Sequence, residues 1–104
     1  MLNTFDKKKL MIATALSTDP DLLLLDEPLG GLQAPEVAET LDLVQKIKGT
    51  GVTVMIIEHN MRAVMTLADN VLVIHHGEKI AEGPPEMVAK DPQVVSVYLG
   101  EEYI

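Results

Sequence analysis

Two short runs of apolar residues, each ending in charged side chains, most constrain what this chain can fold into. The first run is "LLLL", residues 22–25, and the acids of "DEP" follow it directly. The second is "VTVMII", residues 52–57, rich in β-branched residues and followed by "EH". A continuous apolar run without alternation is typical of a strand covered on both faces, as in parallel sheets. Both runs are therefore predicted to be buried strands.

Patterns of helical spacing precede, separate and follow these two strands. Residues 10–16 are predicted to form a helix that ends at turn-forming residues. An amphipathic helix is predicted from Ala34 to about Gly49, because apolar residues recur there at steps of three and four. The remaining elements are a short helix over residues 61–68, two strands about a turn at Gly77 within residues 70–83, and two short helices within residues 84–103.

This order of elements predicts an α/β fold. A helix, a strand, a helix, a strand and a helix followed by a hairpin favour three layers, α/β/α, around a largely parallel sheet. We expect a single domain over residues 1–104, without internal repeats or a low-complexity linker. A chain of this length can bury roughly two thirds of the surface that its unfolded form exposes, so its core depends on a complete set of elements.

Charge and residue usage exclude several classes of function. The formal net charge is −8, from 16 acidic and 8 basic residues, and the basic side chains cluster only at residues 7–9, so nucleic-acid binding is disfavoured. The absence of Cys excludes disulfides and thiolate chemistry. No apolar stretch approaches the roughly 18 to 20 residues of a membrane span, and no signal peptide is indicated. We expect a soluble, cytoplasmic protein without direct membrane insertion.

The polar residues that follow the two strands are the candidate functional residues, because ligands of open α/β sheets bind at the carboxyl ends of strands. Asp26 can hold Mg²⁺ through its water shell, and Glu27 points differently along the strand and is free to act as a base. His59 can bond a phosphate or a catalytic carboxylate. Adjacent residues on a strand face opposite ways, so His75 and His76 do not easily share a metal ion and are predicted to belong to the hairpin.

From about Lys8 onward, these segments taken in order resemble the C-terminal portion of the nucleotide-binding subunits of ATP-binding cassette (ABC) transporters. "LLLLDEP" resembles the Walker B strand with its glutamate, and "GGLQAPE" resembles the D-loop and the start of its helix. "VTVMIIEHNM" is similar to the strand that leads to the switch histidine of the H-loop, and "VLVIHHGEKIAEGPPEMV" to the terminal hairpin and helix. "AEGPPEMVAKDPQVVSVYLGEEY" resembles the tail of ATP-binding subunits of branched-chain (hydrophobic) amino acid uptake systems.

The resemblance implies a P-loop NTPase-like fold, ATP and Mg²⁺ as cofactors, and ATP hydrolysis that drives amino acid uptake. It implies that Asp26 coordinates Mg²⁺ through water, that Glu27 polarises the attacking water and that His59 contacts the γ-phosphate, in a reaction where positioning and charge stabilisation dominate. The implied D-loop, which crosses to the opposite subunit of a dimer, consists of Gly31, Leu32 and Gln33. Gln33 stands where the family usually has Asp or Asn. The implied partners are membrane permease subunits, which would extend the cytoplasmic location to the inner face of the plasma membrane.

Two family motifs are not found in these 104 residues. The P-loop pattern G-x-x-x-x-G-K-[ST], whose backbone N–H groups surround the phosphates, does not occur, and the first glycine is Gly30. "LNTFD", residues 2–6, stands where the signature "LSGGQ" is expected, and only Leu2 is shared. We therefore expect that this chain alone does not bind or hydrolyse ATP tightly, because a pair of carboxylates repels a polyphosphate unless a metal and N–H donors compensate.

Three functions stay open on the sequence. The first is part of an ATP-hydrolysing import subunit, either a fragment or one piece complemented by a separate N-terminal half. The second is a non-catalytic remnant or interaction module that forms homo-oligomers, because the two strands lack their usual neighbours and leave a sheet edge or apolar faces exposed. The third is an acidic metal-binding protein unrelated to nucleotides.

Overall fold

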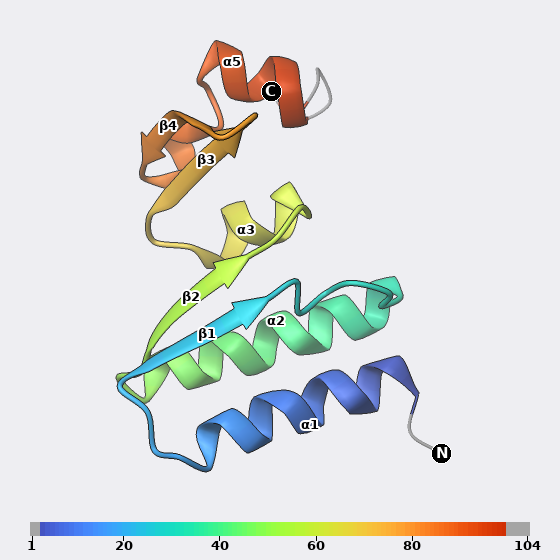
Figure 1. Ribbon diagram of the computed structural model, residues 1–104. Helices are drawn as coiled ribbons and strands as arrows, with labels where there is room; N and C mark the ends of the chain where they lie inside the picture. The colour runs from blue at the N-terminus through green and yellow to red at the C-terminus, as the bar shows by residue number, and fades with distance from the viewer. Residues whose placement is uncertain (1–2, 100–104) are drawn as a thin grey trace. The chain divides into compact units, whose positions relative to one another are not determined.

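The computed structural model describes residues 3–99, which form two compact units that divide between His59 and Asn60. Each unit combines one two-stranded sheet with helices (Figure 1). In the part of the chain that the structure describes, no helix is long and apolar enough to cross a membrane.

The first unit contains a parallel pair of strands joined through a helix. Its elements are α1 (Thr4–Leu16), β1 (Leu22–Asp26), α2 (Ala34–Gly49) and β2 (Thr53–Ile57). The strands pair in a register that sets Leu22 opposite Thr53 and Asp26 opposite Ile57. The two predicted strands and the helix α2 are thus present close to their expected bounds, and α1 packs against β1 while α2 packs against β2 (Figure 1).

Helix α1 is longer than the sequence pattern predicts. It begins at Thr4, six residues before the expected start at Leu10. The cause is a local cap: the side chain of Asn3 accepts a hydrogen bond from the backbone N–H of Asp6 at 2.8 Å. An asparagine cap followed by an acidic residue in the first turn stabilises a helix start even where the segment lacks apolar periodicity.

The core of the first unit lies between the helices and one face of the sheet. Along β1, Leu23 and Leu25 are buried, whereas Leu22 is 51% and Leu24 is 63% exposed. The expectation that this strand is covered on both faces is therefore wrong for the first unit, whose two helices cover only one face. The buried apolar residues of this core are Ile12, Leu23, Leu25, Leu29, Val44 and Ile47.

The second unit is built on an antiparallel hairpin, as the sequence predicts. The turn passes through His76 and Gly77, which both have positive φ, 51° and 76°, as tight hairpin turns require. His75 and His76 belong to this hairpin, and their rings are arranged edge to face with ring centroids 4.0 Å apart. The elements are α3 (Met61–Leu67), β3 (Val71–His75), β4 (Glu78–Gly83), α4 (Pro85–Val88), α5 (Pro92–Val94) and the π-helix η1 (Val95–Leu99).

A small apolar core holds the second unit together. The hairpin contributes Val71 and Val73, and the helices after it contribute Val88 and Val94. The hydroxyl of Tyr98 donates a hydrogen bond to the backbone oxygen of Ile74 at 2.7 Å, which fixes the π-helix on the hairpin. The two predicted C-terminal helices are present, and residues 100–103 of the second lie outside the described residues.

Two neighbouring residues of α1 test which face of this helix packs inward. Ile12 is 3% exposed and Met11 is 65% exposed. Ile12→Ala is expected to lower the free energy of unfolding by about 2–5 kcal/mol, because it removes buried methylenes and leaves a cavity. Met11→Ala should change it by no more than about 0.5 kcal/mol. Urea denaturation of both variants measures the difference, and equal losses would contradict the packing of α1.

Candidate functional site

The candidate site of the first unit lies where β1 and β2 end side by side. Because Asp26 pairs with Ile57 in a parallel ladder, the residues after each strand emerge at the same edge of the sheet. The backbone N–H of Glu27 continues the ladder by one step and donates to the backbone oxygen of Ile57 at 2.7 Å. The structure therefore brings Glu27 and His59 together, as their placement after two neighbouring strands predicts.

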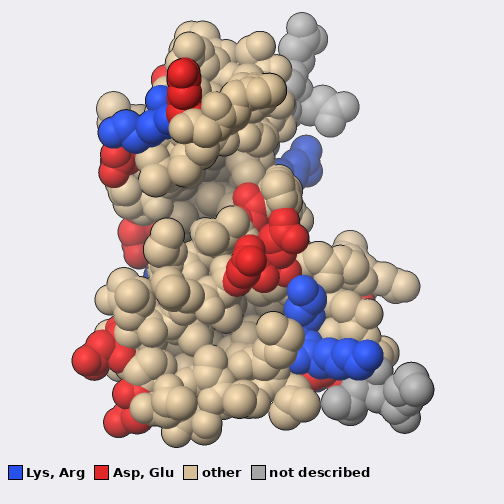
Figure 2. Space-filling view, viewed as in Figure 1, with Lys and Arg blue, Asp and Glu red and all other residues tan. Residues whose placement is uncertain are grey.

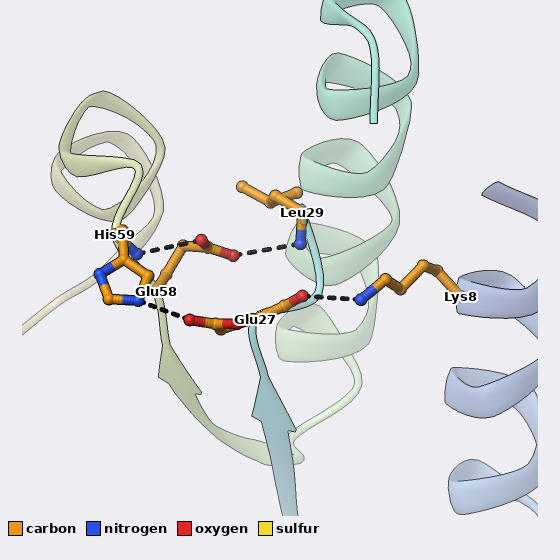
Figure 3. Close-up of polar contacts among 5 residues, drawn as sticks. All are labelled: Lys8, Glu27, Leu29, Glu58 and His59. Carbon is orange, nitrogen blue, oxygen red and sulfur yellow. Dashed lines mark hydrogen bonds and ion pairs between the residues drawn. The ribbon is translucent and has the colours of Figure 1, made fainter. Parts of the chain in front are cut away.

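Glu27 and His59 are in direct contact (Figure 3). Atom Oε1 of Glu27 lies 2.5 Å from Nε2 of His59, with side-chain exposures of 49% and 80%. Of the two kinds of partner that the sequence offers His59, a phosphate or a carboxylate, the carboxylate is the one in contact here. A pair this exposed is screened by water and contributes little to stability, about 0–1 kcal/mol at most. Its geometry therefore matters more for chemistry than for folding.

The backbone of Glu27 is held in a conformation that residues with side chains seldom adopt. Its φ is +50°, in the left-handed region, which for a non-glycine residue costs roughly 1–2 kcal/mol. Two donors meet its carbonyl oxygen: the Nζ of Lys8 at 2.9 Å and the backbone N–H of Gly30 at 3.2 Å. These contacts and the ladder bond to Ile57 hold the turn that directs the carboxylate of Glu27 toward His59 (Figure 3).

Glu58 and Lys8 are two residues of this site for which the sequence predicted no role. The carboxylate of Glu58 accepts the backbone N–H of Leu29 at 3.1 Å and the backbone N–H of His59 at 3.0 Å. It thus links the loop after β1 to the loop after β2. The sequence offered one signal for it, an acidic residue between a strand and the candidate histidine. For Lys8, nineteen residues before its partner Glu27, the sequence offered no signal.

Asp26 ends β1 with its side chain on the exposed face of the sheet. Its carboxylate makes no side-chain hydrogen bond or ion pair with another described residue. A carboxylate open to water has the chemistry to hold the water shell of Mg²⁺, although no three metal-ligating side chains of the described residues are grouped to bind an ion by themselves. The donor set fits a metal whose other ligands come from water or from a bound molecule.

The loop between β1 and α2 contains the predicted D-loop residues. Gly31 has a φ of +77°, and a Cβ there would lie 3.4 Å from the side chain of Thr4, so the position favours glycine. Leu32 is half-buried, and Gln33 is exposed directly before α2. The backbone N–H of Gln33 donates to Oε1 of Glu36 at 2.9 Å, which caps the helix. The amide side chain of Gln33 thus stands at the surface at the start of α2.

The first turn of α1 is capped by a side chain of the chain itself. Helix N-termini bind anions through unpaired backbone N–H groups. Here the N–H of Asp6 is already bonded to the side chain of Asn3, and the carboxylate of Asp6 adds negative charge to the same turn. The described carboxylates at the ends of β1 and β2 have the chemistry to hold the water shell of a metal ion.

Charge at the site is predominantly negative. Figure 2 shows Asp and Glu side chains gathered over the carboxyl ends of β1 and β2, with lysines near the start of α1. The acidic side chains at these strand ends belong to Asp26, Glu27 and Glu58. The ammonium group of Lys8 bonds the backbone oxygen of Glu27 and not the carboxylate of Glu27. Such a surface attracts cations and repels polyphosphates unless a metal ion intervenes.

The sequence and the fold of the chain match those of ABC proteins. Residues 78–104 match the family described as branched-chain amino acid ATP-binding cassette transporter. The chain is 40% identical over 96 residues to the high-affinity branched-chain amino acid transport ATP-binding protein BraF of Pseudomonas aeruginosa, covering 91% of the chain and 38% of the relative. It is 37% identical over 97 residues to the corresponding protein LivG of Escherichia coli K12, covering 92% of the chain and 38% of the relative. The chain thus spans about two fifths of the length of these relatives.

Solved structures of ABC cassettes share this fold. The ADP conformation of MJ1267, an ATP-binding cassette of an ABC transporter, matches with a TM-score of 0.83 and 34% identity, covering 96% of the chain and 41% of that structure. A nucleotide-free ATP-binding cassette from an ABC transporter matches with the same TM-score at 33% identity, covering 96% and 41%. The fold class is therefore the α/β fold of P-loop NTPases, as predicted. The chain matches the C-terminal part of ABC ATP-binding proteins, including proteins named for branched-chain amino acid transport.

The left-handed backbone at Glu27 predicts an unusual order of stability. Glycine adopts a positive φ without penalty and alanine does not. Glu27→Gly should therefore be more stable than Glu27→Ala by about 0.5–1 kcal/mol, measured by urea denaturation.

Glu39, an exposed residue within α2, provides the matched control. There the order should reverse, with Glu39→Gly less stable than Glu39→Ala by about 1 kcal/mol. If the Glu27 variants followed the same order as the Glu39 variants, the left-handed turn after β1 would be absent.

Proposed function

We propose that this chain provides the metal, water and switch residues of an ATP-binding subunit in an ABC importer of branched-chain or other hydrophobic amino acids. The observation that carries the proposal is the contact of Glu27 with His59 at the ends of two parallel strands. The similarity to BraF and LivG, named as branched-chain amino acid transport proteins, supports the substrate class. The role of the family is ATP hydrolysis that drives uptake.

Each residue takes a separate task in this proposal. Asp26, open to water, would hold Mg²⁺ through the water shell of the ion, as the Walker B aspartate. Glu27 would accept a proton from, or orient, the attacking water, and His59, which contacts the carboxylate of Glu27, would keep it in place and reach the γ-phosphate of bound ATP. Mg²⁺ and ATP supply the charge neutralisation and the reacting phosphoryl group when bound.

The D-loop of the proposed subunit comprises the exposed residues that precede α2. In a dimer these residues face the opposite subunit, and Gln33 offers an amide there. The loop consists of Gly31, Leu32 and Gln33.

The triphosphate site of such a subunit has to come from residues other than these. The P-loop pattern is not found in the 104 residues, and the first turn of α1 is capped by Asn3. We therefore propose that this chain acts together with a P-loop segment, and with permease subunits at the membrane. By itself it should bind MgATP weakly and turn it over no faster than background.

A chimera tests this proposal. The P-loop-containing part of LivG is joined to residues 7–104 of this chain, and ATP hydrolysis is measured beside that of the chain alone. We expect turnover only in the chimera. Glu27→Gln and His59→Ala in the chimera should each lower kcat by about 10²–10⁴-fold, because each removes a group that positions or deprotonates the attacking water.

The matched control is Glu39→Gln, which makes the same chemical change on the exposed surface of α2 and should leave kcat unchanged. A chimera that folds, binds MgATP and still does not hydrolyse it would contradict the catalytic proposal. Micromolar ATP binding with steady turnover by the chain alone would contradict the need for a separate P-loop segment.

A second candidate function, a self-associating interaction module, is favoured by one specific observation. The face of the β1–β2 sheet opposite the helices exposes four large apolar side chains by 51–63%: Leu22, Leu24, Met55 and Ile57. Contiguous apolar surface of this kind is seldom left in water. The outer edge of each strand in this two-stranded sheet also offers unpaired backbone groups to another copy.

Light scattering tests this second candidate. The unsubstituted chain should be a dimer or larger, and Leu24→Glu should shift it toward the monomer because it places a charge within the apolar face. Gln45→Glu, an exposed position on α2, adds the same charge away from that face and should not alter the mass. A monomer at high concentration would refute self-association.

A further inference from the structure

The carboxylate of Glu58 bonds both the loop after β1 and the loop after β2. The proposed chemistry requires that these two loops keep a fixed position relative to each other. Atom Oε2 accepts the backbone N–H of Leu29 in the loop after β1, and Oε1 accepts the backbone N–H of His59 after β2 (Figure 3). We infer that Glu58 is a positioning residue, which sets His59 against Glu27 by linking these two loops. The inference rests on the function proposed for Glu27 and His59.

The hydrogen bond from the N–H of Leu29 to Glu58 is costly to lose. Leu29 is only 7% exposed, so its backbone N–H has little access to water and needs an acceptor within the protein. Loss of a partner for a buried N–H is unfavourable, whereas an exposed N–H exchanges one partner for water. The carboxylate of Glu58 is the partner that this amide has, and it comes from the neighbouring strand end rather than from the same loop.

The loop after β1 has few other amides with which to make this link. Pro28 follows Glu27 directly and has no N–H to donate. The N–H of Gly30 turns back to the carbonyl oxygen of Glu27 at 3.2 Å. Leu29 therefore supplies the first N–H after Glu27 that bonds to the loop after β2, and the carboxylate of Glu58 accepts it.

The chemistry of a carboxylate suits this double role. An ionised carboxylate has two acceptor oxygens and no donor, so it can receive two N–H groups at once. The amide of glutamine has one acceptor oxygen, and its NH₂ group opposes the second N–H. Glu58→Gln should therefore keep one of the two bonds, and Glu58→Ala should lose both.

Amide hydrogen exchange on the chain tests the link directly. In Glu58→Ala the Leu29 amide should exchange at least tenfold faster than in the unsubstituted protein, and in Glu58→Gln it should be intermediate. Glu39→Ala, which removes an exposed glutamate from α2, should leave it unchanged. An unchanged Leu29 exchange rate in Glu58→Ala would overturn the inference.

A second measurement separates positioning from simple structural support. The nuclear Overhauser effect between the ring of His59 and the side chain of Glu27 should be present in the unsubstituted chain and lost in Glu58→Ala, with partial recovery in Glu58→Gln. In the LivG chimera, Glu58→Ala should lower kcat at least tenfold with KM for MgATP within about twofold, and Glu58→Gln should restore part of it. A retained His59–Glu27 effect, or an unchanged kcat in an active chimera, would overturn the positioning role.

These outcomes distinguish the inference from the function on which it rests. An unsubstituted chimera that folds but does not hydrolyse ATP defeats the proposed function. In that case, loss of the His59–Glu27 effect in Glu58→Ala would still support the positioning role, and its retention would still overturn that role.

Discussion

The parallel pairing of β1 with β2 is the constraint on which the rest of the candidate site depends. One register places Asp26 opposite Ile57, and the next backbone bond, from Glu27 to Ile57, carries the pairing one residue past the strand. A slip by one residue would reverse which side chains face the helices and would separate Glu27 from His59. The buried Leu23 and Leu25 fix that register, because they fill the core that α1 and α2 cover. Core packing and site geometry therefore follow from the same set of backbone hydrogen bonds.

The backbone at Glu27 is modestly strained, and hydrogen bonds to its own backbone groups offset that strain. Glu27 adopts a left-handed backbone that a side chain disfavours, and Lys8, Gly30 and Ile57 all bond its backbone groups. The contact with His59 is too exposed to stabilise the fold by much. The surroundings are acidic, so the site suits a metal ion and a water molecule better than a bare phosphate chain.

Much of the fold could be predicted from the sequence, because its signals are local. Continuous apolar runs located both parallel strands, and the helical period located α2. The start of α1 was missed because a single residue, Asn3, caps it through a side-chain bond that periodicity does not contain. Burial of β1 on both faces was predicted wrongly. An apolar run shows that a strand has apolar side chains on both faces, but it does not show whether helices of the first unit pack against both of them.

The candidate site was predicted in part, and the reason is again physical. Neighbouring strands bring Glu27 and His59 together, so residue order alone placed them. The sequence could not show that Glu58 would bond Leu29, since that contact depends on the exact course of the loop after β1. It could not show the contact of Lys8 either, because that contact depends on how α1 packs against β1.

The most direct test of this arrangement is the NMR scalar coupling transmitted through hydrogen bonds between the two strands. We predict a coupling between the amide nitrogen of Glu27 and the carbonyl carbon of Ile57, as the last step of the ladder from β1 to β2. A coupling from Glu27 to a different carbonyl, or ladder couplings shifted by one residue, would contradict the register that brings Glu27 to His59.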